Sequence, residues 1–232
     1  MSYFLPFFTV IVSFILTYFF KPNNQKAVKI FLSFSGGFLL GITLFEFLPE
    51  LYGASHHGHD HPHLDHRTVG LWIAGGILFQ IFLEIFSHGA EHGHIHHASQ
   101  SERFPIMFFL SLFIHSFFEG FPLHHTDGIL LGVIIHKFPV AIIVSSFLLQ
   151  SNFSKNKIAL FILLFAFSTP LGVWVSSTFE GIMKYYTHIS ALVVGVFLHV
   201  STTILFESSE GHRYNIAKIT AIISALVMAY FW

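Results

Sequence analysis

Residues 104–149 read FPIMFFLSLFIHSFFEGFPLHHTDGILLGVIIHKFPVAIIVSSFLL. Two apolar runs, at 104–123 and 128–149, are separated by a short polar turn. Each run is long enough to cross a bilayer as a helix, which takes roughly 20 mostly apolar residues. Because the connector is short, the two helices should be antiparallel neighbours. The stretch therefore predicts a helical hairpin within a membrane.

Ionisable residues inside these runs point to a metal site, because a charge within a membrane is costly and is usually kept for function. His115 and Glu119 are four residues apart and therefore share one face of the first helix. The midpoint between His115 and His136 falls within the connector, so both imidazoles should lie about 15 Å from the turn, near the bilayer centre. Two imidazoles and a carboxylate are typical Zn²⁺ ligands. The alternative is a buried His115–Glu119 pair that only stabilises its own helix.

Three neighbouring residues shape this hairpin. Pro139 cannot donate a hydrogen bond to the carbonyl of Ile135, so it leaves a free acceptor beside His136 and bends the helix. Gly120 allows a close backbone approach or a hinge. Lys137 would repel a metal ion unless it pointed away or were neutralised. It lies about 100° around the helix from His136, so it either faces another helix or takes the place of a second metal.

The composition of the whole chain excludes most soluble functions. Of 232 residues, 53% are hydrophobic and only 10% are charged, whereas a soluble domain usually carries about a quarter charged residues. Lys and Arg number 11 against 12 Asp and Glu, so the chain lacks the excess of positive charge that is typical of nucleic-acid binders. The chain has no cysteine, which excludes thiolate zinc sites and disulfides. Its 18 histidines instead indicate a metal.

Apolar runs of membrane-spanning length recur along the chain. They cover about 3–20, 28–49, 69–87, 104–123, 128–149, 158–179, 189–206 and 215–232. This predicts an all-α integral membrane protein with a single transmembrane domain over residues 1–232. The first run lacks a basic start and a cleavage site, so we interpret it as a retained helix. Gln80 and Glu84 interrupt the third run.

The basic residues predict the orientation, because cytoplasmic connectors carry an excess of Lys and Arg. The connectors after the odd-numbered runs hold Lys21, Lys26, Lys29, Arg103, Lys155, Lys157, Arg213 and Lys218. The connectors on the other side hold only Arg67 and Lys184. We therefore expect a protein of the cell membrane or an inner membrane. The odd-numbered connectors should lie in the cytoplasm and both termini on the outer side of the membrane.

Two connectors, 55–66 and 88–97, are rich in histidine. Such a composition favours weak, exchangeable metal binding over a merely solvated loop. The candidate ligands are His56, His57, His59, Asp60, His61, His63, Asp65 and His66 in the first connector, and His92, His94, His96 and His97 in the second.

Motifs in five of the eight runs resemble those of the ZIP (Zrt-/Irt-like protein) family of metal transporters. They are His115–Gly120, His136–Ala141, the stretch from Gly36 to the acids Glu46 and Glu50, Ser168–Gly172 around Pro170, and Gly195–Val200 followed by Glu207. Two positions depart from the usual pattern: Ser116 replaces the common Asn, and His199 replaces a Tyr. The motifs follow one another in the order of the family.

This resemblance implies two inverted three-helix repeats around a central helix pair. It also implies transport of Zn²⁺, and often of Fe²⁺, Mn²⁺ or Cd²⁺, toward the cytoplasm. In family members with two metals, acidic residues of the fifth span help to bridge them. Those positions resemble Lys137 and Val140 here, so we expect one central metal.

Further residues are weaker candidates for the ion pathway, namely Ser116, Glu46, Glu50, His199 and Glu207. Glu46 and Glu50 lie near the outer end of the second run and could pass ions inward, or could simply be interfacial charges. His199 alone is more often a satisfied polar residue than a ligand. Glu207 could receive metal at the inner end. Gly120, Pro139 and Pro170 are expected to shape the helices.

The resulting hypothesis is uptake of a divalent metal, most often zinc, by alternating access. The metal is the transported substrate, no cofactor is expected, and the partners are the lipid bilayer and a second copy of the chain as a homodimer. Acid pH should weaken binding by protonating the ligands. An intramembrane zinc-dependent hydrolase is the alternative, although the chain has no His-Glu-x-x-His motif. A cation-diffusion exporter or a storage protein fits the pattern of runs less well.

Overall fold

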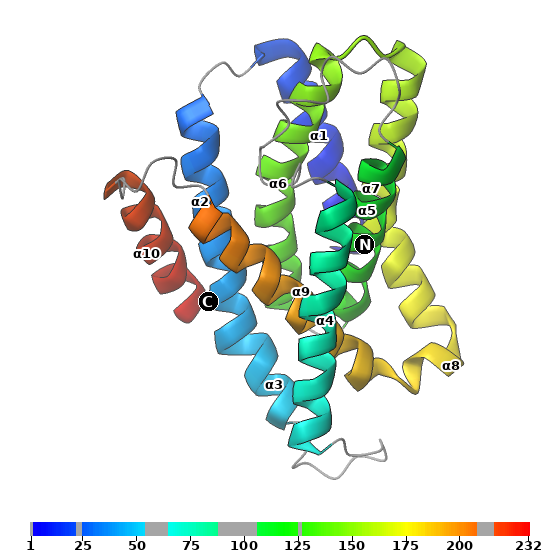
Figure 1. The fold of residues 1–232 in the computed structure, drawn as a ribbon, viewed down its shortest axis with the longest axis vertical. Coiled ribbons are helices and arrows are strands. Elements are labelled where there is room, and N and C mark those ends of the chain that lie inside the picture. Colours follow the sequence, from blue (N-terminus) through cyan, green and yellow to red (C-terminus); the bar gives the residue numbers. More distant parts are fainter. Residues whose placement is uncertain (1, 22–24, 54–64, 88–105, 125–126, 208–215) are drawn as a thin grey trace.

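The structure, a computed structural model, describes residues 2–21, 25–53, 65–87, 106–124, 127–207 and 216–232 (Figure 1). Within these ranges every regular element is helical, which confirms the predicted all-α class. The elements are η1 (Ser2–Phe4), α1 (Leu5–Phe20), α2 (Gln25–Ile42), η2 (Thr43–Phe47), α3 (Leu48–Gly53), α4 (His66–Ser87), α5 (Ile106–Glu119), η5 (Phe121–His124), α6 (Asp127–Gln150), α7 (Lys155–Thr178), α8 (Glu180–Met183), α9 (Tyr186–Glu207) and α10 (Ile216–Tyr230).

Six helical segments in the described part of the chain are long and apolar enough to cross a membrane. They are Lys26–Gly53, His66–Phe86, Ile106–Leu123, Gly128–Gln150, Lys155–Thr178 and Tyr186–Phe206. The helices α1 and α10 have 16 and 15 residues, or roughly 24 and 22 Å. That is less than the hydrocarbon core of about 30 Å. The crossing of the membrane by these two helices therefore stays a prediction.

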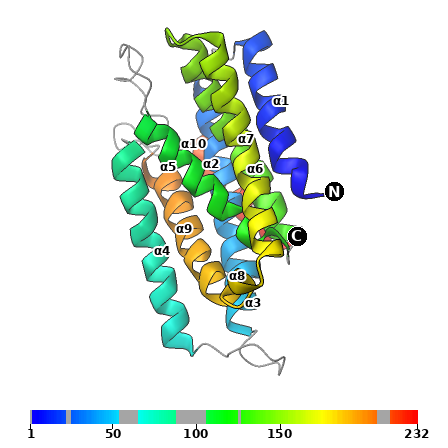
Figure 2. The same cartoon turned by 90° about the vertical axis from the view of Figure 1, so that its right-hand side faces the viewer.

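The helices on either side of the α5–α6 pair are arranged in matching positions. The α4 helix packs against α9 as α10 packs against α2, and α1 packs against α6 as α7 packs against α5 (Figures 1 and 2). In Figure 1, α1 and α4 run upward where α7 and α10 run downward, and α2 and α9 are likewise opposed. This is the arrangement that two inverted three-helix repeats around a central pair produce.

Glycines bring the backbones of several helix pairs into contact. A Cβ atom at Gly76 of α4 would overlap with the carbonyl of Leu192 of α9, and one at Gly195 would overlap with the carbonyl of Ile73. Gly120 and Gly172 make the same kind of contact where the end of α5 meets α7. Small residues allow this close approach between apolar helices, where there is no hydrophobic driving force to hold them together. The contacts fix the positions of the helices that carry polar side chains.

The start of α4 corrects one expectation about the first histidine-rich connector. Asp65 lies at the N-cap of α4 and accepts a hydrogen bond of 2.9 Å from the backbone N–H of Thr68. This hydrogen bonding by Thr68 lowers the pKa of the Asp65 carboxyl below its usual value. His66 is the first residue of the helix. Both residues were expected to lie in a loop, but they form a helix start, because an Asp that precedes a helix can satisfy its free N–H groups. Metal binding by these two residues stays a prediction.

Candidate metal centre

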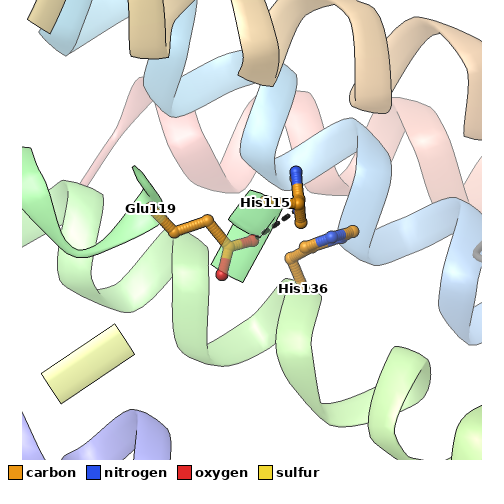
Figure 3. Close-up of side chains that lie close together, drawn as sticks. All are labelled: His115, Glu119 and His136. Carbon is orange, nitrogen blue, oxygen red and sulfur yellow. Dashed lines mark ion pairs between the residues drawn. The ribbon is translucent and has the colours of Figure 1, made fainter. Parts of the chain in front are cut away.

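The last two turns of α5 supply two of the three expected ligands. His115 and Glu119 face the same side of the helix, and His115 Nε2 lies 2.9 Å from Glu119 Oε1 (Figure 3). The α5 helix ends at Glu119, whereas the sequence predicted a continuous run to residue 123. Gly120 and Pro122 follow, and the chain continues as a short 3₁₀ helix, η5. Glu119 is therefore positioned at a helix end that is packed against α7.

The third ligand, His136, comes from α6. Its imidazole lies near that of His115, with the ring centroids 6.4 Å apart (Figure 3). One ligand atom from each of His115, Glu119 and His136 lies within 4.8 Å of the others, and all three residues are buried. Among the described residues, no other group of three or more His, Asp and Glu side chains meets this criterion. The structure therefore brings together the three residues that the helical spacing selected.

The two histidines differ in how they are held. His115 Nδ1 lies 3.1 Å from Oε1 of Gln80, a fully buried residue of α4. With an amide oxygen as the acceptor, Nδ1 carries a hydrogen, so Nε2 is the nitrogen that would offer a lone pair to a metal in place of its present contact with Glu119. In contrast, Nδ1 of His136 is buried and has no hydrogen-bond partner within the described part of the chain. Gln80 was noted in the sequence only as an interruption of an apolar run.

Lys137 points into the centre and binds the second oxygen of Glu119. Its ammonium nitrogen donates hydrogen bonds to Glu119 Oε2 and to Thr169 Oγ1, each at 2.7 Å. It also donates to the hydroxyl of Ser116, and it lies 5.1 Å from the centre of the Phe165 ring. Lys137 thus faces another helix, α7, as well as the carboxylate of Glu119; that it takes the place of a second metal stays a prediction. Ser116 therefore binds the lysine.

A small cavity adjoins these polar groups and has apolar walls. Its lining consists of Leu112, His115, Ser116, Glu119, His136, Lys137, Val140, Phe165, Val200 and Ile204. The residues that α6, α7 and α9 add around the cluster, Val140, Phe165, Val200 and Ile204, offer no metal ligand. The ligand atoms of the cavity are thus concentrated on α5 and on the facing turn of α6.

The acidic residues near the end of the second span lie away from this cluster. The span is interrupted by η2, a π-helical turn that contains Glu46. A Cβ atom at Gly128 would overlap with the Glu46 carboxylate, so this carboxylate lies against the first turn of α6. A carboxylate is favoured there by the positive end of the helix dipole. Glu50 is exposed on α3, one turn further along.

The remaining candidates do not join the centre either. His199 of α9 pairs with Glu84 of α4, at 2.7 Å between Nε2 and Oε2. Glu207 is the last residue of α9, and its side chain is outside the described part of the structure. The ligands predicted at 56–63 and at 92–97 lie outside the described residues. Pro139 and Pro170 lie inside α6 and α7.

The fold and the site together define a class of protein: a bundle of apolar, membrane-length helices around a buried His–Glu–His cluster. The family model described as "ZIP Zinc transporter" matches residues 1–105 and 87–230. The chain belongs to the ZIP zinc transporter family and is an integral, multi-pass membrane protein. The family is described as one of zinc transporters and not of hydrolases.

Individual relatives match a shorter stretch. The chain is 34% identical over 85 residues to zinc transporter SLC39A7 of Sus scrofa and to that of Mus musculus. It is also 34% identical over 83 residues to zinc transporter SLC39A7 of Homo sapiens. The first two matches cover 33% of this chain and 18% of each relative, so the chain aligns with about a fifth of their length.

Proposed function

We propose that this chain transports a divalent metal ion, with zinc as the main substrate, through one site formed by His115, Glu119 and His136. The observation that supports this most is the burial of three ligand atoms from two facing helices within 4.8 Å of one another. In a tetrahedral zinc site, ligand atoms at 2.0–2.1 Å from the metal are roughly 3.3 Å apart. The ligands therefore need to approach by only about 1.5 Å to hold the ion, with water completing the shell.

We also propose that the centre holds one metal at a time. The ammonium of Lys137 is bonded to the outer oxygen of Glu119, so a second cation there would have to displace it. Apart from His136 and Lys137, the residues that α6, α7 and α9 add to the cavity lining are apolar. One oxygen of Glu119 is thus directed toward His115 and the metal, and the other toward a cation that belongs to the protein.

The proposed direction is uptake into the cytoplasm by alternating access. Six lysines lie at or near the helix ends that meet at the upper end of the bundle in Figure 1, namely Lys21, Lys26, Lys29, Lys155, Lys157 and Lys218. Arg67 and Lys184 belong to the opposite end. The positive-inside rule then assigns the upper end to the cytoplasm and the two termini to the outside.

Crosslinking or light scattering in detergent would test the expected homodimer.

The test of this function is uptake of radioactive zinc by proteoliposomes that contain the purified protein. The double variant His115→Ala, His136→Ala should reduce uptake to that of empty vesicles, because one carboxylate alone cannot replace the water of the ion. His188→Ala is the matched control, since this histidine lies at the start of α9 against Trp72 and away from the site. Full uptake by the double variant would reject the site. Competition with Fe²⁺, Mn²⁺ and Cd²⁺ in the same vesicles would rank the substrates.

A further inference from the structure

A second pair of metal-ligand side chains lies between α4 and α9, beyond the central site. His199 Nε2 and Glu84 Oε2 are 2.7 Å apart. These two side chains are 16% and 23% exposed, whereas those of His115 and Glu119 are 5% and 2% exposed. We propose that Glu84 and His199 form a second, weaker metal site, which zinc occupies between the central site and the end of the bundle where α4 and α9 end. This inference rests on the proposed transport function.

Polar atoms connect this pair to the central site. Gln80 bonds to the ring of His115 through Oε1. Glu84 follows Gln80 by four residues on α4, so the two side chains are neighbours on one face of that helix, with Cβ atoms about 5–6 Å apart. Glu84 in turn contacts His199. Figure 2 shows α4, α5 and α9 side by side, as their packing requires. Oxygen and nitrogen ligands thus follow one another from the buried site toward one end of the bundle.

The position of the pair also fits movement of an ion along α9. The next residue after His199, Val200, lines the central cavity, and so does Ile204 one turn further on. At the end of α4, the chain continues into the histidine-rich stretch 88–97 of the sequence. An ion that leaves the central cavity along α9 toward the end of α4 would therefore meet Glu84 and His199.

The chemistry of the pair suits brief occupancy. One imidazole and one carboxylate provide two zinc ligands, and the partial exposure of both side chains leaves room for water to complete the shell. A site with two protein ligands should bind more weakly than the three-ligand centre. Passage requires this balance, because an ion must bind well enough to enter a site and weakly enough to leave it.

Helix packing does not account for the pair. The α4 and α9 helices are already in backbone contact through Gly76 and Gly195, each one or two turns away from the pair. An additional hydrogen bond between partly exposed side chains contributes only about 1 kcal/mol. Two ionisable groups within membrane-length helices are a high cost for such a small gain, and a functional role explains their presence.

The first test separates metal binding from hydrogen bonding by two substitutions at one position. Glu84→Gln keeps a hydrogen-bonding partner for His199 but removes the carboxylate ligand. Glu84→His removes the carboxylate but supplies another zinc ligand. We expect Glu84→Gln to lower zinc uptake in proteoliposomes at least tenfold, and Glu84→His to retain at least half of the wild-type rate. Equal uptake by Glu84→Gln and wild type, or lower uptake by Glu84→His than by Glu84→Gln, would overturn the proposal.

The second test reads the site directly. The chain has no cysteine, so in the Glu84→Cys variant a thiolate-to-cobalt absorption band can arise only at this position. We expect Co²⁺ to produce the band, and the added substitution His199→Ala to abolish it. Absence of the band, or its persistence without His199, would contradict a two-ligand site. If wild-type protein itself failed to take up zinc while the band appeared, the transport function would be wrong and the site would stand.

Discussion

The two helices of the central site hold their histidines in opposite ways. On α5, both ring nitrogens of His115 have partners, Glu119 at 2.9 Å and Gln80 at 3.1 Å. On α6, Nδ1 of His136 is buried and has no partner among the described residues. A buried polar atom without a partner costs about 1–3 kcal/mol, and coordination of a metal through this atom would remove that cost. In the proposed site, the α5 side is thus held before a metal binds, whereas the α6 side would gain most from binding.

The backbones of the two helices show the same contrast, with α5 held in place and α6 less constrained. The end of α5 is fixed to α7 by the close contact of Gly120 with the carbonyl of Thr169. The α6 helix contains Pro139 three residues after its ligand, and a proline removes one hydrogen bond from the helix interior. The α5 helix is therefore the fixed wall of the site, and α6 is the wall able to adjust.

A substitution that displaces the end of α5 should have the largest effect. In Gly120→Ala, the new Cβ overlaps with the backbone of Thr169 and Val173, so the end of α5 and Glu119 must shift. Overpacking of this kind costs about 1–3 kcal/mol. We expect a clearly lower Tm in detergent and loss of zinc uptake.

Gly75→Ala is the control for this substitution, because a Cβ at Gly75 of α4 meets open space. It should raise stability by roughly 0.5–1 kcal/mol through helix propensity. An unchanged Tm and full uptake in Gly120→Ala would show that α5 does not depend on this contact.

Release of His115 from α4 should have the next largest effect. Gln80→Leu removes the acceptor of Nδ1 and lets the ring rotate, and loss of such a supporting contact typically weakens metal affinity about 10–100-fold. Zinc affinity can be measured by competition with a fluorescent chelator. Gln80→Glu keeps an acceptor oxygen and should recover most of the affinity. Equal affinities for Gln80→Leu and wild type would show that α5 alone orients the ring.

The sequence alone predicted much of this arrangement, because helical geometry converts spacing into position. The four-residue interval places His115 and Glu119 on one face, and the distances from the connector place His136 opposite. The apolar runs likewise predicted the helices to within a few residues at most ends. The assignment of the three residues as metal ligands stays a proposal.

Other features depend on how each helix is rotated about its axis, and spacing within a single helix does not determine that. The direction of Lys137 toward Glu119, and the meeting of Gln80 with His115, follow from how different helices pack against one another. A signal for Gln80 and Glu84 was nevertheless present, since two polar residues four apart in an apolar run share a buried or functional face.

The charge of Lys137 provides a further test of how α6 contributes. In Lys137→Gln, an amide can still donate a hydrogen bond to Glu119, but the positive charge next to the metal is gone. Since like charges repel strongly at low dielectric, we expect zinc affinity to rise about tenfold or more (about 1.4 kcal/mol per tenfold change) and zinc release to slow. Lys137→Arg, which keeps the charge, should not tighten binding. Weaker zinc binding in Lys137→Gln would mean that Lys137 serves mainly to keep Glu119 in place.

The smallest expected effect concerns the ability of α6 to adjust. Pro139→Ala restores the N–H that can bond to the carbonyl of Ile135, so α6 should become straighter and stiffer near His136. If α6 is the wall that moves, zinc affinity should stay within about threefold of wild type while the maximal uptake rate falls severalfold, because a stiffer helix opposes the change of access rather than the binding step. Measurement of both quantities on the same protein separates the two steps. A Pro139→Ala variant with a normal maximal rate but weaker binding would assign the proline to ligand positioning and would make α6 as fixed as α5.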